Sequence, residues 1–213
     1  MSELVPYPLT KQTLDKTLAA CLLVATVPLF VGAGLAMGAD MAFSRRDRGP
    51  WLYRERRISR GREFDLLKFR TLRQEALEAQ AEHESHARLL EADAENLTWA
   101  GRVFLKRWYL DELPQLINVL RGDMSLVGPR PWPLQMVGQQ LASGRDYRNR
   151  IMAGWTGPAQ IEKGITEPAG YAALDLAYVE GCENWGMLRL LRYDLRTLLR
   201  TAKVIARGEG LSY

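Results

Sequence analysis

The chain has 213 residues, of which 47% are hydrophobic and 25% are charged, and its formal net charge is +4. This composition excludes a disordered, a collagen-like and a disulfide-stapled protein. A domain of this length buries most of the surface that its unfolded chain exposes, so we expect one substantial core that needs neither metals nor disulfides.

The first predicted element is an apolar segment near the N-terminus. No charged residue occurs between Lys16 and Asp40, and residues 18–37 are almost all Leu, Val, Ala, Phe and Gly. This uncharged run of about 23 residues is long enough for a membrane helix, which needs roughly 20. A buried core helix and a cleaved signal peptide are the alternatives, but the apolar run is longer than the core of a signal peptide. We therefore expect a retained membrane segment over residues 17–41.

Pro28 interrupts this segment, where it removes a helix hydrogen bond and clashes with the preceding turn. The kink is compatible with a bent spanning helix and with a re-entrant helix whose two ends leave on the same face. Lys and Arg are enriched in the cytoplasmic flanks of membrane segments. An arginine-rich collar follows the segment, so we expect the body of the protein on the cytoplasmic face, with the collar attracting anionic headgroups. The collar comprises Arg45, Arg46, Arg48, Arg54, Arg56, Arg57, Arg60 and Arg62.

Two short strands, 51–53 and 64–69, are expected to pair through a turn at residues 59–61. Residues 73–96 are rich in Ala, Glu and Leu and predict an exposed helix, which holds both histidines of the chain, His83 and His86. No cysteine or third histidine completes a zinc ligand set there. Cys21 and Cys182 lie far apart in the sequence, which excludes a CxxC motif and suits a reducing compartment.

A further helix is predicted to begin at Asp111, with Asp111 as its N-cap, Pro114 in its first turn and Gly122 at its C-terminal stop. The chain should then continue as a proline-constrained loop, an amphipathic segment, a turn-rich stretch and two helices. These are expected over residues 124–132, 134–150, 153–170, 172–180 and 188–207.

Asp111 and Glu112 are adjacent carboxylates at this predicted helix start, where free N–H groups and the positive end of the helix dipole stabilise anions. A capping acid is the alternative explanation of such a pair. Residue types that bind phosphate accompany it, since Arg offers a planar fork and Lys a point charge. They are Lys68, Arg70, Lys106, Arg107, Arg121 and Arg130. The pattern indicates a site where an anionic substrate meets an Asp nucleophile, as in acyl-phosphate chemistry, with Mg²⁺ to neutralise charge.

Three runs of sequence resemble those of the bacterial sugar transferase family, whose members are monotopic phosphoglycosyl transferases that prime polysaccharide or glycoconjugate assembly. The runs are LLKFRT at 66–71, LDELPQLINVLRGDMSLVGPRP at 110–131 and GPAQ at 157–160. The middle run keeps its register over more than twenty residues and is highly specific. The resemblance covers nearly the whole chain, from about residue 11 to residue 207.

The resemblance implies a covalent mechanism at the cytoplasmic face of the bacterial inner membrane. Asp111 would attack the sugar-linked phosphate of a UDP-sugar and release UMP. A polyprenyl (undecaprenyl) phosphate would then take the phosphosugar, giving a polyprenyl diphosphosugar. Glu112 matches the family's second catalytic carboxylate, which assists proton transfer or positioning. Mg²⁺ is the implied cofactor, with Asp111 among its ligands.

The resemblance also assigns phosphate-binding roles to basic residues. Lys68 and Arg70 match the family's basic pair before a threonine, and Arg130 matches the arginine of the Pro-Arg-Pro loop. Lys106 stands where the family usually has Arg. Pro28 matches the proline near which the family's re-entrant helix breaks, which favours the re-entrant alternative.

The chain departs from the family pattern at residues 152–160. The usual motif there is RPGITGWAQ, whereas this chain has MAGWTGPAQ, so a cation and an aromatic residue are missing. Four residues remain as candidates for nucleotide or sugar contacts, with Arg150 as a substitute for the missing cation. They are Arg150, Gln160, Asp175 and Tyr178.

The expected fold is of the α+β class and mostly helical, with a re-entrant membrane helix, amphipathic interfacial helices and a small β-hairpin around a cytoplasmic active site. The expected parts are an N-terminal segment, the membrane segment, the catalytic domain and a tail, over residues 1–16, 17–41, 42–207 and 208–213. The expected partners are a UDP-sugar, polyprenyl phosphate and inner-membrane lipid, and a homodimer is compatible with the sequence. The small net charge argues against nucleic acid.

Two alternative functions differ from a phosphoglycosyl transferase, one in its class and the other in its leaving group. A non-catalytic scaffold that binds anionic lipid or a partner through the arginine-rich collar would leave the carboxylate pair beside so many cations unexplained. A glycosyl transferase that passes the sugar without its phosphate would release UDP instead of UMP. Serine hydrolases and nucleotide-binding P-loop or Rossmann proteins are disfavoured, because GxSxG, Walker A and GxGxxG motifs are absent.

Overall fold

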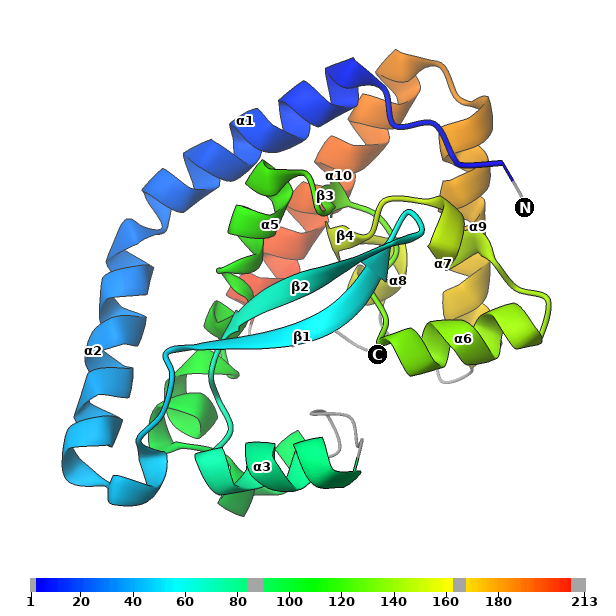
Figure 1. Ribbon diagram of the computed structural model, residues 1–213. Coiled ribbons are helices and arrows are strands. Elements are labelled where there is room, and N and C mark those ends of the chain that lie inside the picture. Colours follow the sequence, from blue (N-terminus) through cyan, green and yellow to red (C-terminus); the bar gives the residue numbers. More distant parts are fainter. Residues whose placement is uncertain (1–2, 84–89, 163–167, 208–213) are drawn as a thin grey trace. The chain divides into compact units, whose positions relative to one another are not determined.

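The computed structural model describes residues 3–83, 90–162 and 168–207 of the chain (Figure 1). It is mostly helical and contains a small antiparallel β-hairpin, in agreement with the expected α+β class. The chain divides into two compact units, which we call the first and the second unit. The first unit comprises Met1–Cys21, Glu55–Leu66 and Leu116–Tyr213, and the second comprises Leu22–Arg54 and Leu67–Gln115.

The predicted membrane segment forms two helices, α1 (Leu9–Ala25) and α2 (Val27–Phe43). The break lies at Thr26, because Pro28 takes a place in the first turn of α2, where its missing N–H costs no hydrogen bond. In the part of the chain that the structure describes, no single helix has both the length and the apolar composition of a membrane span. The two helices together pass that test, bent by 56°, as a broken span or a re-entrant loop would.

The hairpin consists of β1 (Leu52–Ser59) and β2 (Arg62–Phe69), the long two-stranded ribbon of Figure 1. Its turn residues Arg60 and Gly61 both have positive φ, 50° and 74°, as a two-residue type I′ turn requires. The predicted turn is therefore confirmed, but β1 is longer than the strand predicted at 51–53. The continuation of β1 was not predicted, because the four charged residues at 54–57 interrupt the hydrophobic alternation by which strands are recognised.

A parallel pair of three-residue strands lies within the first unit. Strand β3 (Ser125–Val127) pairs with β4 (Gly154–Thr156), with Ser125 opposite Gly154. The backbones approach so closely that a Cβ atom at Gly154 would lie 2.1 Å from the Gly128 nitrogen. The predictions of a loop at 124–132 and of turns at 153–170 are thus wrong at these strands.

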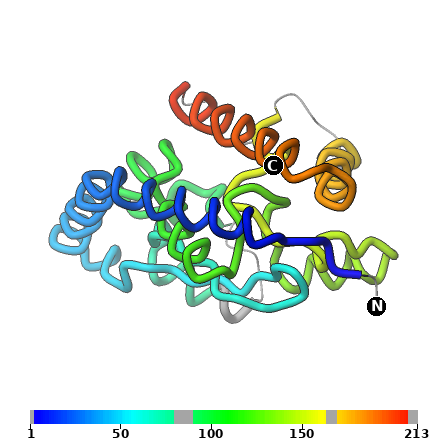
Figure 2. Tube along the Cα trace, turned by 90° about the horizontal axis from the view of Figure 1, so that it is seen from above, coloured from blue at the N-terminus to red at the C-terminus, as the bar shows by residue number. Residues whose placement is uncertain are grey.

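Helices complete the first unit around this strand pair. α10 (Met187–Ala206) packs against β3, β4 and α8 (Pro158–Ile161), and α9 (Pro168–Asn184) packs against α8. Figure 2 shows the tight connection between α9 and α10. Both helices were predicted, and each begins earlier along the chain than expected. The amphipathic segment 134–150 forms α6 (Leu134–Ala142) and α7 (Tyr147–Arg150).

The helix predicted over 73–96 is confirmed only in part. α3 covers Gln74–His83, a single 3₁₀ turn, η2, covers Ala94–Asn96, and His86 lies outside the described residues. A β-bridge joins Leu72 and Leu97, both buried in the second unit. Two further irregular turns belong to this unit, the 3₁₀ turn η1 (Arg45–Asp47) and the π-helical turn η3 (Gly101–Leu105).

Candidate active site

Asp111 lies in a 3₁₀ turn, η4 (Leu110–Glu112), and the α-helix α5 begins only at Gln115 and ends at Arg121. The prediction that Asp111 is the N-cap of an α-helix is therefore wrong. Tyr109, directly before the turn, has φ 56° and ψ 24°, the left-handed conformation that costs a non-glycine residue about 1–2 kcal/mol. The C-terminal stop at Gly122 is confirmed, with φ 84° and a Schellman pair of hydrogen bonds. The carboxylate pair thus sits on an irregular, strained turn.

Both carboxylates of this turn are buried, with Asp111 only 6% and Glu112 only 5% exposed. Burial raises the pKa of Asp111 to about 7, and the negative charge of Glu112 adds to the shift. Lys68 and Lys106 act in the opposite direction and lower this pKa. The second unit therefore brings together the two predicted catalytic carboxylates and two of the predicted phosphate-binding lysines.

The two carboxylates, unlike the lysines, are of the ligand type that Mg²⁺ takes. Among the described residues no group of three or more His, Cys, Asp or Glu could hold a metal. Mg²⁺ needs only one or two protein carboxylates, because water and substrate phosphate oxygens supply its remaining ligands. The buried carboxyl groups of Asp111 and Glu112 are donors of this kind, and a bound cation would offset the burial and the repulsion by Glu112 that raise the pKa of Asp111.

Arg70 lies at the end of β2 but is directed into the second unit, with an exposed fraction of 1%. Its guanidinium donates to the backbone oxygens of Asp47, Pro50 and Leu72 at 2.5, 2.8 and 2.8 Å. Burial lowers the pKa of Arg70. This side chain anchors the chain that leaves the hairpin, and its nitrogens are bound to protein carbonyls.

Arg70→Gln is expected to destabilise the protein by about 2–3 kcal/mol, because it leaves buried carbonyl groups without donors. Urea unfolding followed by circular dichroism measures this loss. Arg45→Gln removes an exposed arginine of the same region and should change the unfolding free energy by less than about 0.5 kcal/mol. Equal losses in the two variants would contradict the anchoring role of Arg70.

The other candidates belong to the first unit. Arg130 follows β3 and is partly exposed, and its carbonyl accepts a hydrogen bond from Arg148 Nη1 at 2.7 Å. Arg150, the suggested substitute cation, is bound to Glu183 Oε1 and to the Glu3 carbonyl, at 2.6 Å each. Its charge is therefore already paired within the protein.

Gln160, Asp175 and Tyr178 are all buried in the first unit. The Asp175 carboxylate pairs with Arg148, and burial raises its pKa to about 6 although Arg148 acts in the opposite direction. The Gln160 side chain donates to the Trp155 carbonyl at 3.5 Å, and the Tyr178 hydroxyl bonds Asp194 Oδ1 at 2.8 Å. These side chains hold the first unit together.

A closed ring of polar side chains in the first unit was missed by the sequence reading. Lys11 Nζ lies 2.6 Å from Asp194 Oδ2 and 3.5 Å from Asp15 Oδ2. Ser125 donates to the same Asp15 oxygen at 2.6 Å, and the Tyr178 hydroxyl lies 3.1 Å from the Val127 carbonyl. The ring joins α1, β3, α9 and α10. In the sequence, Lys11 is one of the two basic residues, with Lys16, that precede the predicted membrane segment.

The arginine-rich collar is partly neutralised by acidic neighbours. Arg46 pairs with Glu75 at 3.0 Å, and both side chains are about two-thirds exposed. Arg57 pairs with Glu55 at 2.5 Å. Surface pairs of the first kind contribute little to stability, but they reduce the net charge that the collar presents.

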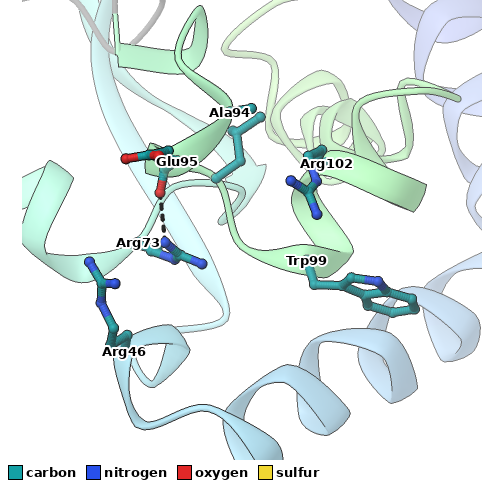
Figure 3. A pocket seen from close by; sticks show the side chains of 7 residues that line it. Arg46, Arg73, Ala94, Glu95, Trp99 and Arg102 are labelled. Atoms are coloured by element: carbon teal, nitrogen blue, oxygen red, sulfur yellow. Dashed lines mark hydrogen bonds between the residues drawn. The ribbon is translucent and has the colours of Figure 1, made fainter.

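A basic cleft of about 290 Å³ opens in the second unit (Figure 3). Figure 3 shows the Arg73 guanidinium beside Glu95, whose backbone oxygen it bonds at 2.7 Å. Arg73 also pairs with Asp47 at 2.9 Å. The cleft is lined by Arg46, Arg73, Ala94, Glu95, Leu97, Trp99 and Arg102. None of the predicted site residues lines it, and two of its three arginines are already paired with carboxylates.

Comparison with known proteins gives consistent matches along the chain. A model described as bacterial sugar transferase matches residues 6–208. The undecaprenyl-phosphate glucose phosphotransferase of Komagataeibacter xylinus is 34% identical over 86% of this chain. The UDP-glucose:undecaprenyl-phosphate glucose-1-phosphate transferase of Caulobacter vibrioides is 35% identical over 91% of it. The undecaprenyl-phosphate galactose phosphotransferase of Salmonella typhimurium is 32% identical over 94% of it. The chain spans 34%, 70% and 41% of these three relatives, respectively.

Proposed function

Because the chain belongs to the bacterial sugar transferase family, we propose that it transfers a phosphosugar from a UDP-sugar to undecaprenyl phosphate. The products are UMP and an undecaprenyl diphosphosugar, the primer of a polysaccharide or glycoconjugate. Three relatives, each at least 32% identical, carry names that describe transfer of glucose or galactose phosphate to this lipid. The observation that carries the proposal is the buried Asp111 carboxyl with a raised pKa, beside Glu112 and opposed by two lysines.

Asp111 is the nucleophile of the proposed reaction. Its carboxylate oxygen attacks the phosphorus that bears the sugar, the new bond to phosphorus forms, and the bond from phosphorus to the UMP oxygen breaks. An oxygen of undecaprenyl phosphate then attacks the same phosphorus and displaces the Asp111 carboxylate. Burial favours the attack, because a carboxylate removed from water reacts without first shedding a hydration shell.

The neighbouring charges have separate roles in this proposal. Glu112 assists proton transfer or orients Asp111, and Lys68 and Lys106 hold the approaching phosphates, whose charge would otherwise be repelled by the two carboxylates. Lys106 already contacts the Glu91 carboxylate, which fixes the position of its ammonium group. Asp111 and Glu112 would hold Mg²⁺, which supplies charge neutralisation for phosphoryl transfer when bound. Arg130 would bind a further phosphate oxygen.

The lipid acceptor requires the site to lie close to a membrane surface. The bent pair α1 and α2 has the length and composition of a re-entrant loop, and the arginine-rich collar follows directly after it. We infer that the pair enters the cytoplasmic leaflet of the inner membrane and returns to the same face. The collar would then lie at the level of the anionic headgroups.

The nucleotide product tests the proposed function. Protein in detergent or nanodiscs, incubated with Mg²⁺, undecaprenyl phosphate and either UDP-glucose or UDP-galactose, should release UMP. Chromatography distinguishes UMP from UDP. Release of UDP would indicate a glycosyl transferase that leaves the phosphate behind. The absence of any nucleotide product, with lipid binding intact, would favour the scaffold function.

A further inference from the structure

We propose that Arg148 is a positioning residue for Arg130, which it serves by fixing the backbone of the Pro129-Arg130-Pro131 loop. The inference rests on the proposed function, in which Arg130 binds a phosphate of the substrate. Arg148 belongs to α7, is 8% exposed, and therefore acts from inside the first unit. The two arginines have different tasks, since Arg130 is partly exposed and Arg148 is buried.

Three contacts of one guanidinium group support this role. Nη1 of Arg148 donates to the Arg130 carbonyl at 2.7 Å. The same guanidinium carbon lies 4.0 Å from the centre of the Trp132 ring, a stacking contact. Nη2 pairs with the Asp175 carboxylate on α9. Arg148 thus connects Arg130 of the loop, and the adjacent Trp132, to a helix that is remote from them in sequence.

The form of the ion pair indicates that stability alone does not explain this arrangement. Arginine and aspartate usually pair through two parallel hydrogen bonds when both are buried. Here Nε of Arg148 and Oδ1 of Asp175 are buried and have no hydrogen-bond partner within the described residues. Nη2 alone bonds Asp175, while Nη1 is directed at the Arg130 carbonyl. Each unsatisfied buried polar atom costs free energy, so a pair that leaves two of them is not optimised for stability.

The loop itself explains why external donors are needed. Proline fixes φ of residues 129 and 131 but has no N–H group and leaves the carbonyl orientations open. Each of the three carbonyl groups of the loop accepts a hydrogen bond from another part of the first unit. The donors are Gly154 N to Pro129 at 2.9 Å, Arg148 Nη1 to Arg130 at 2.7 Å, and Arg57 Nη1 to Pro131 at 3.1 Å. A loop held at every carbonyl presents its side chain with little loss of entropy on binding.

A double-mutant cycle tests whether Arg148 acts through Arg130. Arg148→Lys keeps a charge for Asp175 but loses the planar fork and the stacking on Trp132. We expect it to weaken binding of UDP, measured by calorimetry, and to raise KM in UMP release, each by roughly tenfold, with kcat changed much less. The Arg130→Ala variant should lose at least as much affinity for UDP and raise KM at least as far. The double variant should be no worse than Arg130→Ala alone, because residues that act through one another are not additive.

The matched control is Arg145→Lys, which alters an exposed arginine three residues away and should bind UDP as the parent does. Losses that add up in the double variant would overturn the proposal, because Arg148 would then act independently of Arg130. A purely structural role would instead lower the apparent kcat through loss of folded protein and leave KM unchanged. A thermal melt of each variant detects such a loss.

Hydrogen exchange decides the proposal even if the proposed reaction fails. The amides of residues 128–134 that carry a hydrogen should exchange at least several-fold faster in the Arg148→Lys variant than in the parent or in the Arg145→Lys control. They belong to Gly128, Arg130, Trp132 and Leu134. Unchanged exchange in this loop would overturn the proposal, whatever the activity. A parent protein that releases no UMP but shows the faster exchange in Arg148→Lys would refute the proposed function and leave the positioning role of Arg148 supported.

Discussion

Asp111→Asn should abolish UMP release, by at least about a thousandfold, because an amide cannot replace the carboxylate nucleophile. Asparagine has nearly the same shape, so the turn Leu110–Glu112 should keep its structure. The measurement is UMP formed in a single turnover with UDP-sugar and Mg²⁺. Mass spectrometry of the parent protein, incubated with donor alone, should show the phosphosugar bound to Asp111, and the variant should show none. Full activity in the variant would exclude the covalent mechanism.

The same substitution should also stabilise the protein above neutral pH. The pKa of Asp111 is raised from 3.8 to about 7 in the folded state. Between these values the folded protein holds a proton that the unfolded chain has released. The unfolding free energy of the parent therefore falls as the pH rises from about 4 to about 7, and stays low above it. The rise in pKa from 3.8 to about 7 corresponds to at most about 4 kcal/mol of unfolding free energy, which asparagine would recover in part.

Urea unfolding in EDTA at pH 5 and pH 8 measures this second effect. The unfolding free energy of the Asp111→Asn variant should exceed that of the parent most at pH 8 and only a little at pH 5. Glu112→Gln is the matched comparison, since it removes the negative charge that helps to raise the pKa of Asp111 but keeps the nucleophile. Mg²⁺ should stabilise the parent more than the Asp111→Asn variant, because binding to the folded state alone raises its stability. A variant that is less stable than the parent at pH 8 would contradict the raised pKa.

Features governed by local chemistry were predictable from the sequence. The turn at Arg60 and Gly61, the helix stop at Gly122 and the helix break near Pro28 each follow from the φ angles that those residues permit. Helix α10 was predictable because its apolar residues recur at helical spacing. The carboxylate pair could be recognised from its neighbours in the chain. Its place in an irregular turn could not be predicted, because nothing in the sequence indicates that Tyr109 has a positive φ.

Features governed by tertiary packing were not predictable. Strands β3 and β4 have three residues each, too few for a periodic pattern, and their pairing depends on Gly128 and Gly154 meeting across the sheet. The sequence also could not reveal that Arg70 and Arg150 bind protein groups. A basic residue has the same sequence pattern whether it faces a substrate phosphate or a backbone carbonyl, and only the fold distinguishes them.

Lys11 is the strongest example of a residue whose role depends on remote partners, since its ion-pair partner Asp194 is 183 positions away. Lys11→Met should destabilise the protein by about 3–5 kcal/mol, because Asp194 and Asp15 would then lack the buried cation between them. Urea unfolding of detergent-solubilised protein measures the loss. Lys16→Met removes an exposed lysine from the same helix and should change the unfolding free energy by less than about 0.5 kcal/mol.

The double variant Lys11→Met with Asp194→Leu separates the cost of an unpaired charge from the loss of the bond itself. If the unpaired Asp194 carboxylate causes the damage, removing that carboxylate as well should recover part of the stability, since a buried pair can be replaced by apolar groups at little net cost. The Tyr178 hydroxyl would lose its 2.8 Å bond to Asp194 but keep the Val127 carbonyl as acceptor. A double variant less stable than Lys11→Met alone would mean that Asp194 stabilises the ring chiefly through Tyr178, independently of the lysine.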